Sequence, residues 1–262
     1  MIKATWYISK SLNSDTVKII YNMAAAVKNH AREIDIKIIN AHDKSSSIFE
    51  KSLRVFKRAD IWHLFGKAPL FWKFIRVHSK TVHTQFNEHE KLSGYPAKFL
   101  FTNFHETNVI LPSFGSLVLR AGESEKAIYT DDVNKIDAEK ISDENIKTID
   151  LSKFDIPEKA LSGIYITYDP SLLSALRCGL LTMRGLAIAS VKSEYLNEIL
   201  APDGYYLIDE NSDMSKIIRY GLNEKGRHLA TSARHFIKTR HSDEKSAESI
   251  FNLYRAILGA NK

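Results

Sequence analysis

Apolar and polar positions along the first ninety residues follow two alternating patterns. Short apolar runs predict strands, and the stretches between them place apolar residues three or four positions apart, as on one face of a helix. Strands that alternate with helices predict βαβ crossovers and a parallel sheet with helices on both faces. The predicted strands cover 2–9, 33–40, 60–66 and 80–87, and the predicted helices cover 15–29, 45–59 and 69–79.

The same alternation returns in the second half of the chain after an interruption. Residues 91–125 carry Gly and Pro between short apolar runs, which is typical of a domain junction. After this region the pattern predicts another parallel sheet with its helices, followed by a helical tail. The predicted strands cover 126–132, 144–151, 160–170, 185–190 and 204–209, and the tail helices cover 214–222, 224–239 and 242–258.

We therefore expect an α/β protein of two Rossmann-like domains. The boundaries are 1–115 for the first domain and 116–240 for the second, and a terminal helix in 241–262 is expected to pack back on the first. Ligands of such sheets bind beyond the carboxyl ends of the strands. The two domains are expected to face each other across a cleft between these edges, which suits a reaction of two substrates.

Composition and charge narrow the class of protein. The chain has 262 residues, 44% of them hydrophobic and 26% charged, and none of its apolar runs approaches the roughly 20 residues that cross a bilayer. The N-terminus is too interrupted by polar residues for a signal peptide, so we expect a cytoplasmic protein. The single cysteine, Cys178, excludes a disulfide within the chain and a cysteine-based zinc site. The net charge of +6 favours anionic partners, but its scattered Lys and Arg residues argue against nucleic acid.

A series of short motifs in the second half suggests a family. The segments "SLLSALRCGLL", "GLAIAS", "EYLNEIL", "DGYYLID" and "RHSDEKSAESIFNLYRAIL" follow one another in this order. This order resembles the donor-binding half of GT-B glycosyltransferases of family 4 (glycosyl transferases group 1), over residues 160–258. The first half resembles the family more loosely, through "ADIWHLFG" and "TVHTQF".

The resemblance implies a reaction and its substrates. It implies transfer of a sugar from a nucleotide-diphosphate sugar, such as a UDP- or GDP-sugar, to a glycan, a lipid-linked or a protein acceptor. The family usually binds no metal, so no cofactor is expected. The donor is held mainly by the C-terminal half.

The donor site implied by the resemblance begins at Ser171 and Leu172, where the chain enters a helix whose free N–H groups suit a diphosphate. The alternative is that Ser171 only caps a core helix. Ser174 stands where the family has the glutamate that contacts the donor ribose, and Ile166 stands where its paired glutamate would lie. The E-x7-E pair is therefore missing. A different ribose contact such as Asp169, an altered donor and an inactive relative all remain open.

Basic residues for the departing diphosphate are harder to find. The family carries an Arg and a Lys near the first strand of this half, and Arg120 and Lys126 are the nearest candidates. Arg177 and Arg184 flank the helix that follows Ser171, and each either counters the diphosphate or lies on a solvated face.

Two further residues are expected to border the donor. Ser190 ends the "GLAIAS" strand, and Glu194 begins the next helix, beside the position where the family binds donor phosphate or sugar. The alternative for Glu194 is favourable charge at a helix N-terminus.

The first half offers candidates for the acceptor side. His83 and His63 each lie in a predicted strand near its carboxyl end, where a histidine can serve as a base. His83 is the candidate catalytic residue, because "TVHTQF" resembles the family segment whose histidine approaches the substrates. A structural role for each histidine is the alternative. Ser11 and Asn13 are candidate acceptor contacts, since the loop after the first strand lacks glycines.

The segment 66–80 combines four basic residues with Phe71, Trp72 and Phe74. A basic aromatic helix can lie at an anionic membrane surface, which would place the protein at the inner face of a membrane. The alternative is a crossover helix that packs its aromatic side chains on the sheet.

Three hypotheses follow from the sequence. The first is a glycosyltransferase that uses a nucleotide sugar. The second is a catalytically inactive GT-B-like protein that binds a nucleotide sugar or serves as a scaffold, because the glutamate pair is missing. The third is a Rossmann-like protein that binds nucleic acid or a membrane surface.

Overall fold

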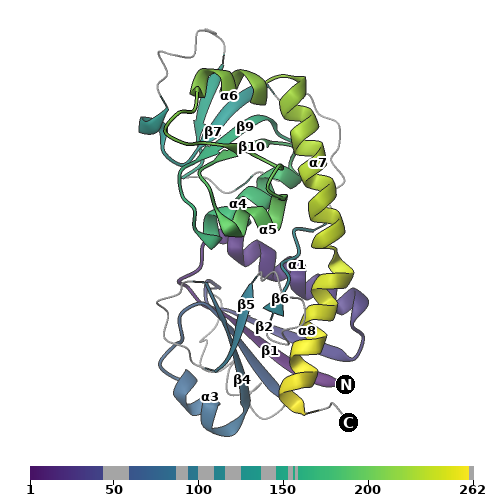
Figure 1. Ribbon diagram of the computed structural model, residues 1–262. Coiled ribbons are helices and arrows are strands. Elements are labelled where there is room, and N and C mark those ends of the chain that lie inside the picture. Colours follow the sequence, from purple (N-terminus) through teal and green to yellow (C-terminus); the bar gives the residue numbers. More distant parts are fainter. Residues whose placement is uncertain are drawn as a thin grey trace. The chain divides into compact units, whose positions relative to one another are not determined.

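The computed structural model describes residues 1–43, 59–86, 94–99, 109–115, 125–136, 146–152, 156 and 159–259. The predicted helix at 45–59, apart from its last residue, and Arg120 lie outside these residues. The chain divides into unit 1, Met1–Gly115 with Ser242–Lys262, and unit 2, Ser116–His241. Each unit is an α/β structure built on its own parallel sheet (Figure 1).

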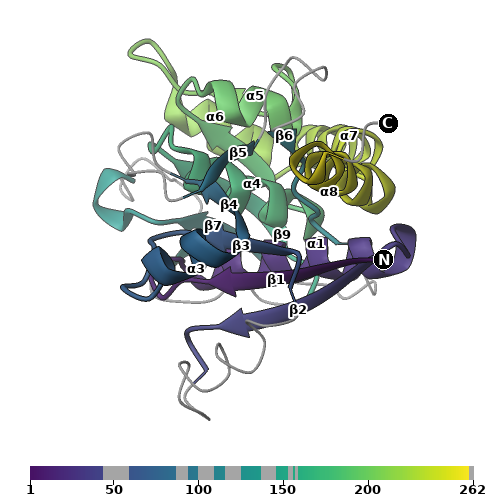
Figure 2. The same cartoon turned by 90° about the horizontal axis from the view of Figure 1, so that it is seen from below.

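The sheet of unit 1 has six strands in the order β2-β1-β3-β4-β5-β6 (Figure 2), and every neighbouring pair is parallel. The four strands predicted from the first ninety residues are present. The last two strands fall in the stretch that the pattern described as irregular, so the sequence prediction missed them. The strands are β1 (Ile2–Ile8), β2 (Ile34–Asn40), β3 (Ile61–Phe65), β4 (Lys80–Gln85), β5 (Tyr95–Phe99) and β6 (Val109–Ile110).

Helices cover the sheet of unit 1 because each has an apolar face. Helix α1 (Ser14–His30) begins after Asn13, whose side chain accepts a hydrogen bond from the Thr16 amide, and it buries Ile19, Ile20 and Met23. The C-terminal helix α8 (Asp243–Leu258) is capped by Ser242 and packs against α1 (Figure 1).

A buried chain of hydrogen bonds joins α8 to the sheet. The Trp6 indole donates to the Tyr254 hydroxyl at 2.6 Å, and that hydroxyl lies 2.8 Å from Nδ1 of His63. The other ring nitrogen of His63 lies 2.6 Å from the Thr84 hydroxyl. Because the Tyr254 oxygen already accepts from Trp6, its proton is available to His63 Nδ1, so we assign His63 as the neutral tautomer that carries its proton on Nε2.

The buried hydrogen bonds of His63 make the free energy of unfolding of unit 1 depend on pH. Burial, together with the charge of His83, holds the pKa of His63 well below 6.5, so the native state keeps the ring neutral while an unfolded chain protonates it below about pH 6.5. The stability is fully present above that pH and falls as the pH decreases. We expect His63 alone to lower the unfolding free energy as the pH falls below about 6.5, with a limiting slope of about 1.4 kcal/mol per pH unit.

Denaturant titrations followed by tryptophan fluorescence test this, because all three tryptophans lie in unit 1. His63→Asn should weaken the pH dependence, whereas His228→Asn, on the exposed surface of unit 2, should leave it unchanged. An equal pH dependence in the native protein and in His63→Asn would contradict the assignment.

The sheet of unit 2 has five parallel strands in the order β11-β10-β9-β7-β8. The first strand of the unit, β7, lies between the second and the third, so the chain crosses over in opposite directions on its two sides. The carboxyl edge between β7 and β9 is therefore the topological switch point, where open α/β sheets bind ligands. The strands are β7 (Lys126–Thr130), β8 (Lys147–Asp150), β9 (Ser162–Thr167), β10 (Ala187–Ser190) and β11 (Tyr206–Leu207).

The core of unit 2 lies between this sheet and its helices. Ile128, Ile164 and Ile166 of the central strands are fully buried, as the continuous apolar character of their segments predicted. Among the helices that the structure describes, none is long and apolar enough to cross a membrane. The helices of unit 2 are η1 (Val133–Lys135), α4 (Leu172–Met183), α5 (Glu194–Leu200), α6 (Met214–Gly221) and α7 (Glu224–Arg240).

Candidate functional site

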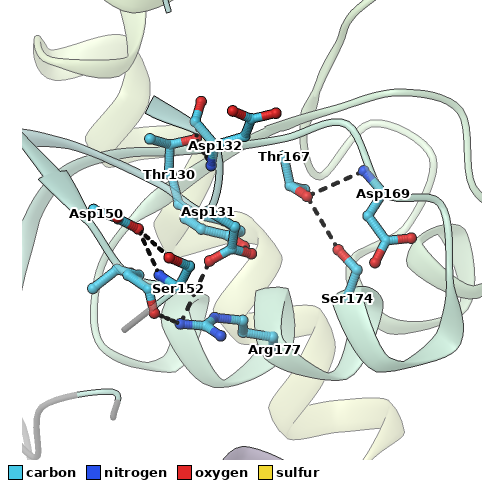
Figure 3. Close-up of polar contacts among 11 residues, drawn as sticks. Thr130, Asp131, Asp132, Asp150, Ser152, Thr167, Asp169, Ser174 and Arg177 are labelled. Atoms are coloured by element: carbon cyan, nitrogen blue, oxygen red, sulfur yellow. Dashed lines mark hydrogen bonds and ion pairs between the residues drawn. The ribbon is translucent and has the colours of Figure 1, made fainter. Parts of the chain in front are cut away.

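A pocket of about 230 Å³ opens in unit 2 where β7 and β9 end, at the switch point of the sheet (Figure 3). Its walls come from the two segments that follow these strands. The lining residues are Thr130, Asp131, Asp132, Lys135, Ile166, Thr167, Tyr168 and Asp169.

The two walls repeat one local structure. Thr130 and Thr167 are buried at the last position of their strands, and each hydroxyl accepts a hydrogen bond from the amide two residues later, Asp132 at 3.1 Å and Asp169 at 3.3 Å. These bonds turn the chain sharply at both strand ends. The two following aspartates are thereby held at the rim of one pocket.

Asp131 is held from two sides. It accepts a short hydrogen bond from the Tyr165 hydroxyl, and its other carboxylate oxygen lies 3.5 Å from the Arg177 guanidinium. Arg177 also donates to the Leu151 carbonyl at 2.6 Å, and its side chain is only 14% exposed. Burial raises the pKa of Tyr165, and the charges of Cys178 and Asp131 add to that rise. The main role of Asp131 is therefore to hold β7, β9 and α4 together, and not to bind a ligand.

Asp132 is more accessible than Asp131, because its side chain is 41% exposed and that of Asp131 is 33% exposed. Figure 3 shows its side chain directed away from Arg177, on the opposite side of the backbone from that of Asp131. Its ion pair with Lys135, at 3.5 Å, joins two exposed side chains and contributes little. The Asp132 carboxylate is thus available to accept hydrogen bonds from a ligand.

Tyr168 adds an aromatic wall. The Lys135 ammonium lies 5.2 Å from the centre of its ring, and burial, with the charge of Asp132, raises the pKa of the phenol. At neutral pH the phenol is protonated, so Tyr168 offers both an apolar face and a hydroxyl donor.

Asp169 lies at the N-terminus of α4. Its carboxylate accepts from the Ser171 amide at 2.9 Å and from the Ser171 hydroxyl at 2.8 Å. Ser171 in turn caps α4 by accepting from the Ser174 amide. A negative charge thus already lies at the helix end that the sequence analysis assigned to a diphosphate. Ser171 caps the helix, and its contact with a donor stays a prediction.

The pocket offers hydrogen-bonding groups to a ligand that carries hydroxyls. Carboxylates beside threonine and tyrosine hydroxyls can accept and donate hydrogen bonds to a neutral polyol such as a ribose or a hexose. Within the part of the chain that the structure describes, three or more His, Cys, Asp or Glu side chains are nowhere grouped to hold a metal ion.

The other donor-side candidates fall into two groups. Leu172 and Ser174 are buried in the first turn of α4, where the Ser174 hydroxyl lies 3.2 Å from that of Thr167, beside the pocket. Ser190 is buried at the end of β10, and Glu194 is exposed in the first turn of α5, so both lie at the carboxyl edge of the sheet.

Two basic candidates were placed wrongly. Lys126 begins β7, and Arg184 is buried at the end of α4, so both lie toward the amino edge of the sheet, away from the pocket. The reason is the direction of the elements: a parallel strand presents its first residue, and a crossover helix its last, at the edge opposite the ligand. Arg177 is no solvated surface residue either, because Asp131 and Leu151 hold it.

Among the candidates of unit 1, Ser11 and Asn13 follow the carboxyl end of β1, whereas His63 and His83 lie within β3 and β4. Ser11 and Asn13 are exposed in the loop after β1, where the Ser11 hydroxyl accepts from the Lys67 amide at 3.0 Å. His63 and His83 are buried, and His83 donates from Nε2 to the Gly66 carbonyl at 3.0 Å. Burial favours the structural alternative for both histidines. The catalytic role of His83 stays a prediction.

Sequence reasoning missed most of the pocket. Of its lining residues it had named only Asp169, as an alternative ribose contact, and Ile166. The signal was present in the letters, since "TDD" and "TYD" each follow a buried strand. What the letters do not reveal is that these two strands are neighbours.

Comparison with solved structures identifies the architecture. A glycosyltransferase from Rickettsia africae ESF-5 matches with a TM-score of 0.61 at 11% identity, covering 100% of both chains. AviGT4, a glycosyltransferase involved in avilamycin A biosynthesis, matches with a TM-score of 0.58 at 8% identity over 99% of both chains. HepE from Anabaena, solved in complex with UDP and glucose, matches with a TM-score of 0.54 at 9% identity, covering 98% of this chain and 100% of its own.

At these identities the likeness concerns the fold. The two Rossmann-like units of this chain match GT-B glycosyltransferase structures, as the resemblance in sequence predicted. No protein-family model matches the chain, and no curated protein matches it either.

Proposed function

We propose that this protein is a glycosyltransferase that takes a sugar from a nucleotide-diphosphate sugar and binds that donor at the pocket of unit 2. The observation that carries the proposal is the pocket itself. It lies at the switch point of a unit whose fold matches glycosyltransferases, and carboxylate and hydroxyl groups line it. HepE, a protein of the same fold, was solved with UDP and glucose, which supports a nucleotide sugar as the ligand.

The proposal assigns a role to each accessible group. Asp132 and Asp169 accept hydrogen bonds from ribose or sugar hydroxyls and take the place of the glutamate pair that this chain lacks. Tyr168 lies against the base or the sugar ring. The acceptor is a glycan, a lipid-linked molecule or a protein.

A thermal-shift titration with UDP, GDP, UDP-sugars and GDP-sugars tests donor binding. A ligand at 100 times its dissociation constant should stabilise the protein by about 2.7 kcal/mol. Asp132→Asn should weaken the nucleotide-sugar response about 10- to 100-fold in dissociation constant, because a hydrogen bond to a charged group is worth about 1.5–3 kcal/mol. Asp203→Asn, an exposed aspartate elsewhere in unit 2, is the matched control and should leave the response unchanged. If none of these nucleotides shifts the transition, donor binding is refuted.

A second candidate is a GT-B-like protein that binds the nucleotide sugar without transferring the sugar. Ser174 favours it, because this buried residue presents a hydroxyl, bonded to Thr167, where the resemblance implies a carboxylate. The two candidates separate in an assay of the donor itself. A transferase hydrolyses a radiolabelled nucleotide sugar slowly when no acceptor is present, and a binding protein that shows the thermal shift returns it intact.

A further inference from the structure

Helix α3 (Trp72–His78) and the turn before it expose large apolar side chains on the surface of unit 1. Leu70 is 97% exposed and Phe74 is 55% exposed. Leu70 lies in the turn directly before the helix and Phe74 lies in its first turn, so both exposed side chains belong to one short segment. Trp72 and Ile75, by contrast, are buried against the sheet. One face of the segment thus packs on the sheet, as one alternative predicted, and the other face carries exposed apolar side chains.

The charged residues in this stretch of the sequence have one sign. Between Ile61 and Asn87 the sequence has no Asp or Glu, while it has Lys67, Lys73, Arg76 and Lys80. Lys67, Lys73 and Arg76 are exposed and lie on the same short segment as the apolar pair. We call Lys67, Leu70, Lys73, Phe74 and Arg76 the α3 patch.

The patch is held firmly by the core of unit 1. Trp72 contacts Trp62 edge-on, with ring centres 6.2 Å apart, and lies beside Tyr7 in the same apolar cluster. The Trp72 amide donates to the Pro69 carbonyl at 3.0 Å, which fixes the turn that carries Leu70. The exposed side chains thus belong to a well-packed segment. Poor packing of the segment therefore does not explain their exposure.

We propose that the α3 patch docks unit 1 on the surface of an anionic lipid bilayer. Leu70 and Phe74 enter the region between headgroups and acyl chains, and the basic residues pair with lipid phosphates. Nucleic acid would use the same cations but has no use for an exposed leucine and phenylalanine, and a second copy of the chain would bring the same positive charge to the contact. The combination of apolar and purely basic groups therefore favours a lipid surface.

Vesicle flotation tests this proposal with the full-length protein. Vesicles of phosphatidylcholine with 30% phosphatidylglycerol should bind it, and pure phosphatidylcholine vesicles should bind at least tenfold less, because each basic residue near an anionic surface contributes about fivefold. Leu70→Ser/Phe74→Ser and Lys73→Glu/Arg76→Glu should each lower the partition coefficient at least tenfold. Leu207→Ser and Lys225→Glu/Arg227→Glu change exposed residues of unit 2 in the same way and should bind like the native protein.

A second readout reports insertion directly. Trp6, Trp62 and Trp72 are all buried, so a tryptophan introduced as Leu70→Trp is the one at the surface of the molecule. Its emission should shift to the blue on anionic vesicles and should be quenched by brominated lipids. A Leu70→Trp emission unchanged by vesicles overturns the proposal. Loss of self-association, or loss of binding to duplex DNA, in the patch variants with vesicle binding intact overturns it as well and identifies the other partner. None of these results depends on the proposed sugar transfer.

Discussion

Asp131→Ala is expected to lower the unfolding free energy of unit 2 by about 2–3 kcal/mol, because two groups that are largely out of water each lose one partner. Arg177 loses the counter-ion of a guanidinium that is 14% exposed, and the Tyr165 hydroxyl loses its acceptor. Since Asp131 joins β7, β9 and α4, the loss should also loosen the pocket rim. Chemical denaturation followed by far-UV circular dichroism measures the effect.

The neighbouring residue provides the matched comparison. Asp132→Ala removes an ion pair between two exposed side chains, so it should cost less than about 0.5 kcal/mol. Substitutions of the two adjacent aspartates should therefore have different effects: Asp131 governs stability, and Asp132 governs the response to nucleotide sugars. Equal stability of the two variants would mean that the contacts of Asp131 with Tyr165 and Arg177 carry no net energy.

Gly163→Ala is expected to destabilise unit 2 by more than about 4 kcal/mol. Gly163 lies in the central strand β9 with a φ of +129°, and a Cβ at this position would overlap the carbonyl oxygen of Ala127 on the paired strand β7. The strands cannot move apart without breaking the ladder that carries both walls of the pocket. We expect the variant to be largely unfolded in unit 2.

Gly259→Ala separates the clash from the backbone strain. Gly259 also has a positive φ, of 72°, but a Cβ there meets no atom within 4 Å, so its replacement should cost about 1 kcal/mol. Tryptophan fluorescence, which reports unit 1, and circular dichroism, which reports both units, locate the damage in Gly163→Ala. A Gly163→Ala protein as stable as Gly259→Ala would contradict the register of β7 and β9.

Some residues of the candidate site could be named from the sequence, and others could not. Ser171 was named because a capping residue and the turn before it mark a helix start locally, and Ser174 and Asp169 were named through the resemblance to the glycosyltransferase family. Asp131 and Asp132 were not named, although "TDD" ends a predicted strand. Lys126 and Arg184 were named and proved to lie toward the far edge, since their distance from the motif in sequence says nothing about which end of an element they occupy.

The sequence by itself determined the elements of this protein. Apolar periodicity predicted the boundaries of most of the described strands and helices to within a few residues. It could do so because the burial of one face depends on the residues of the segment itself. Strand β5 was missed because it contains Pro96 and directly follows Gly94, and strand β6 was missed because it has only two residues. The order of the motifs in the second half also carried the resemblance that the fold comparisons later matched.

Only the tertiary structure decided which segments meet. The strand order makes β7 and β9 neighbours and thereby joins "TDD" and "TYD" in one pocket. The two strands are more than thirty residues apart in the sequence. The tertiary structure also decided the partner of His63, because Tyr254 lies 191 residues away in the sequence. It likewise decided which aromatic residue of α3 is exposed, because Trp72 is buried and Phe74 is not. Local patterns report what a segment buries, but the contact between distant segments is a property of the packed chain, and a site made of such contacts appears only there.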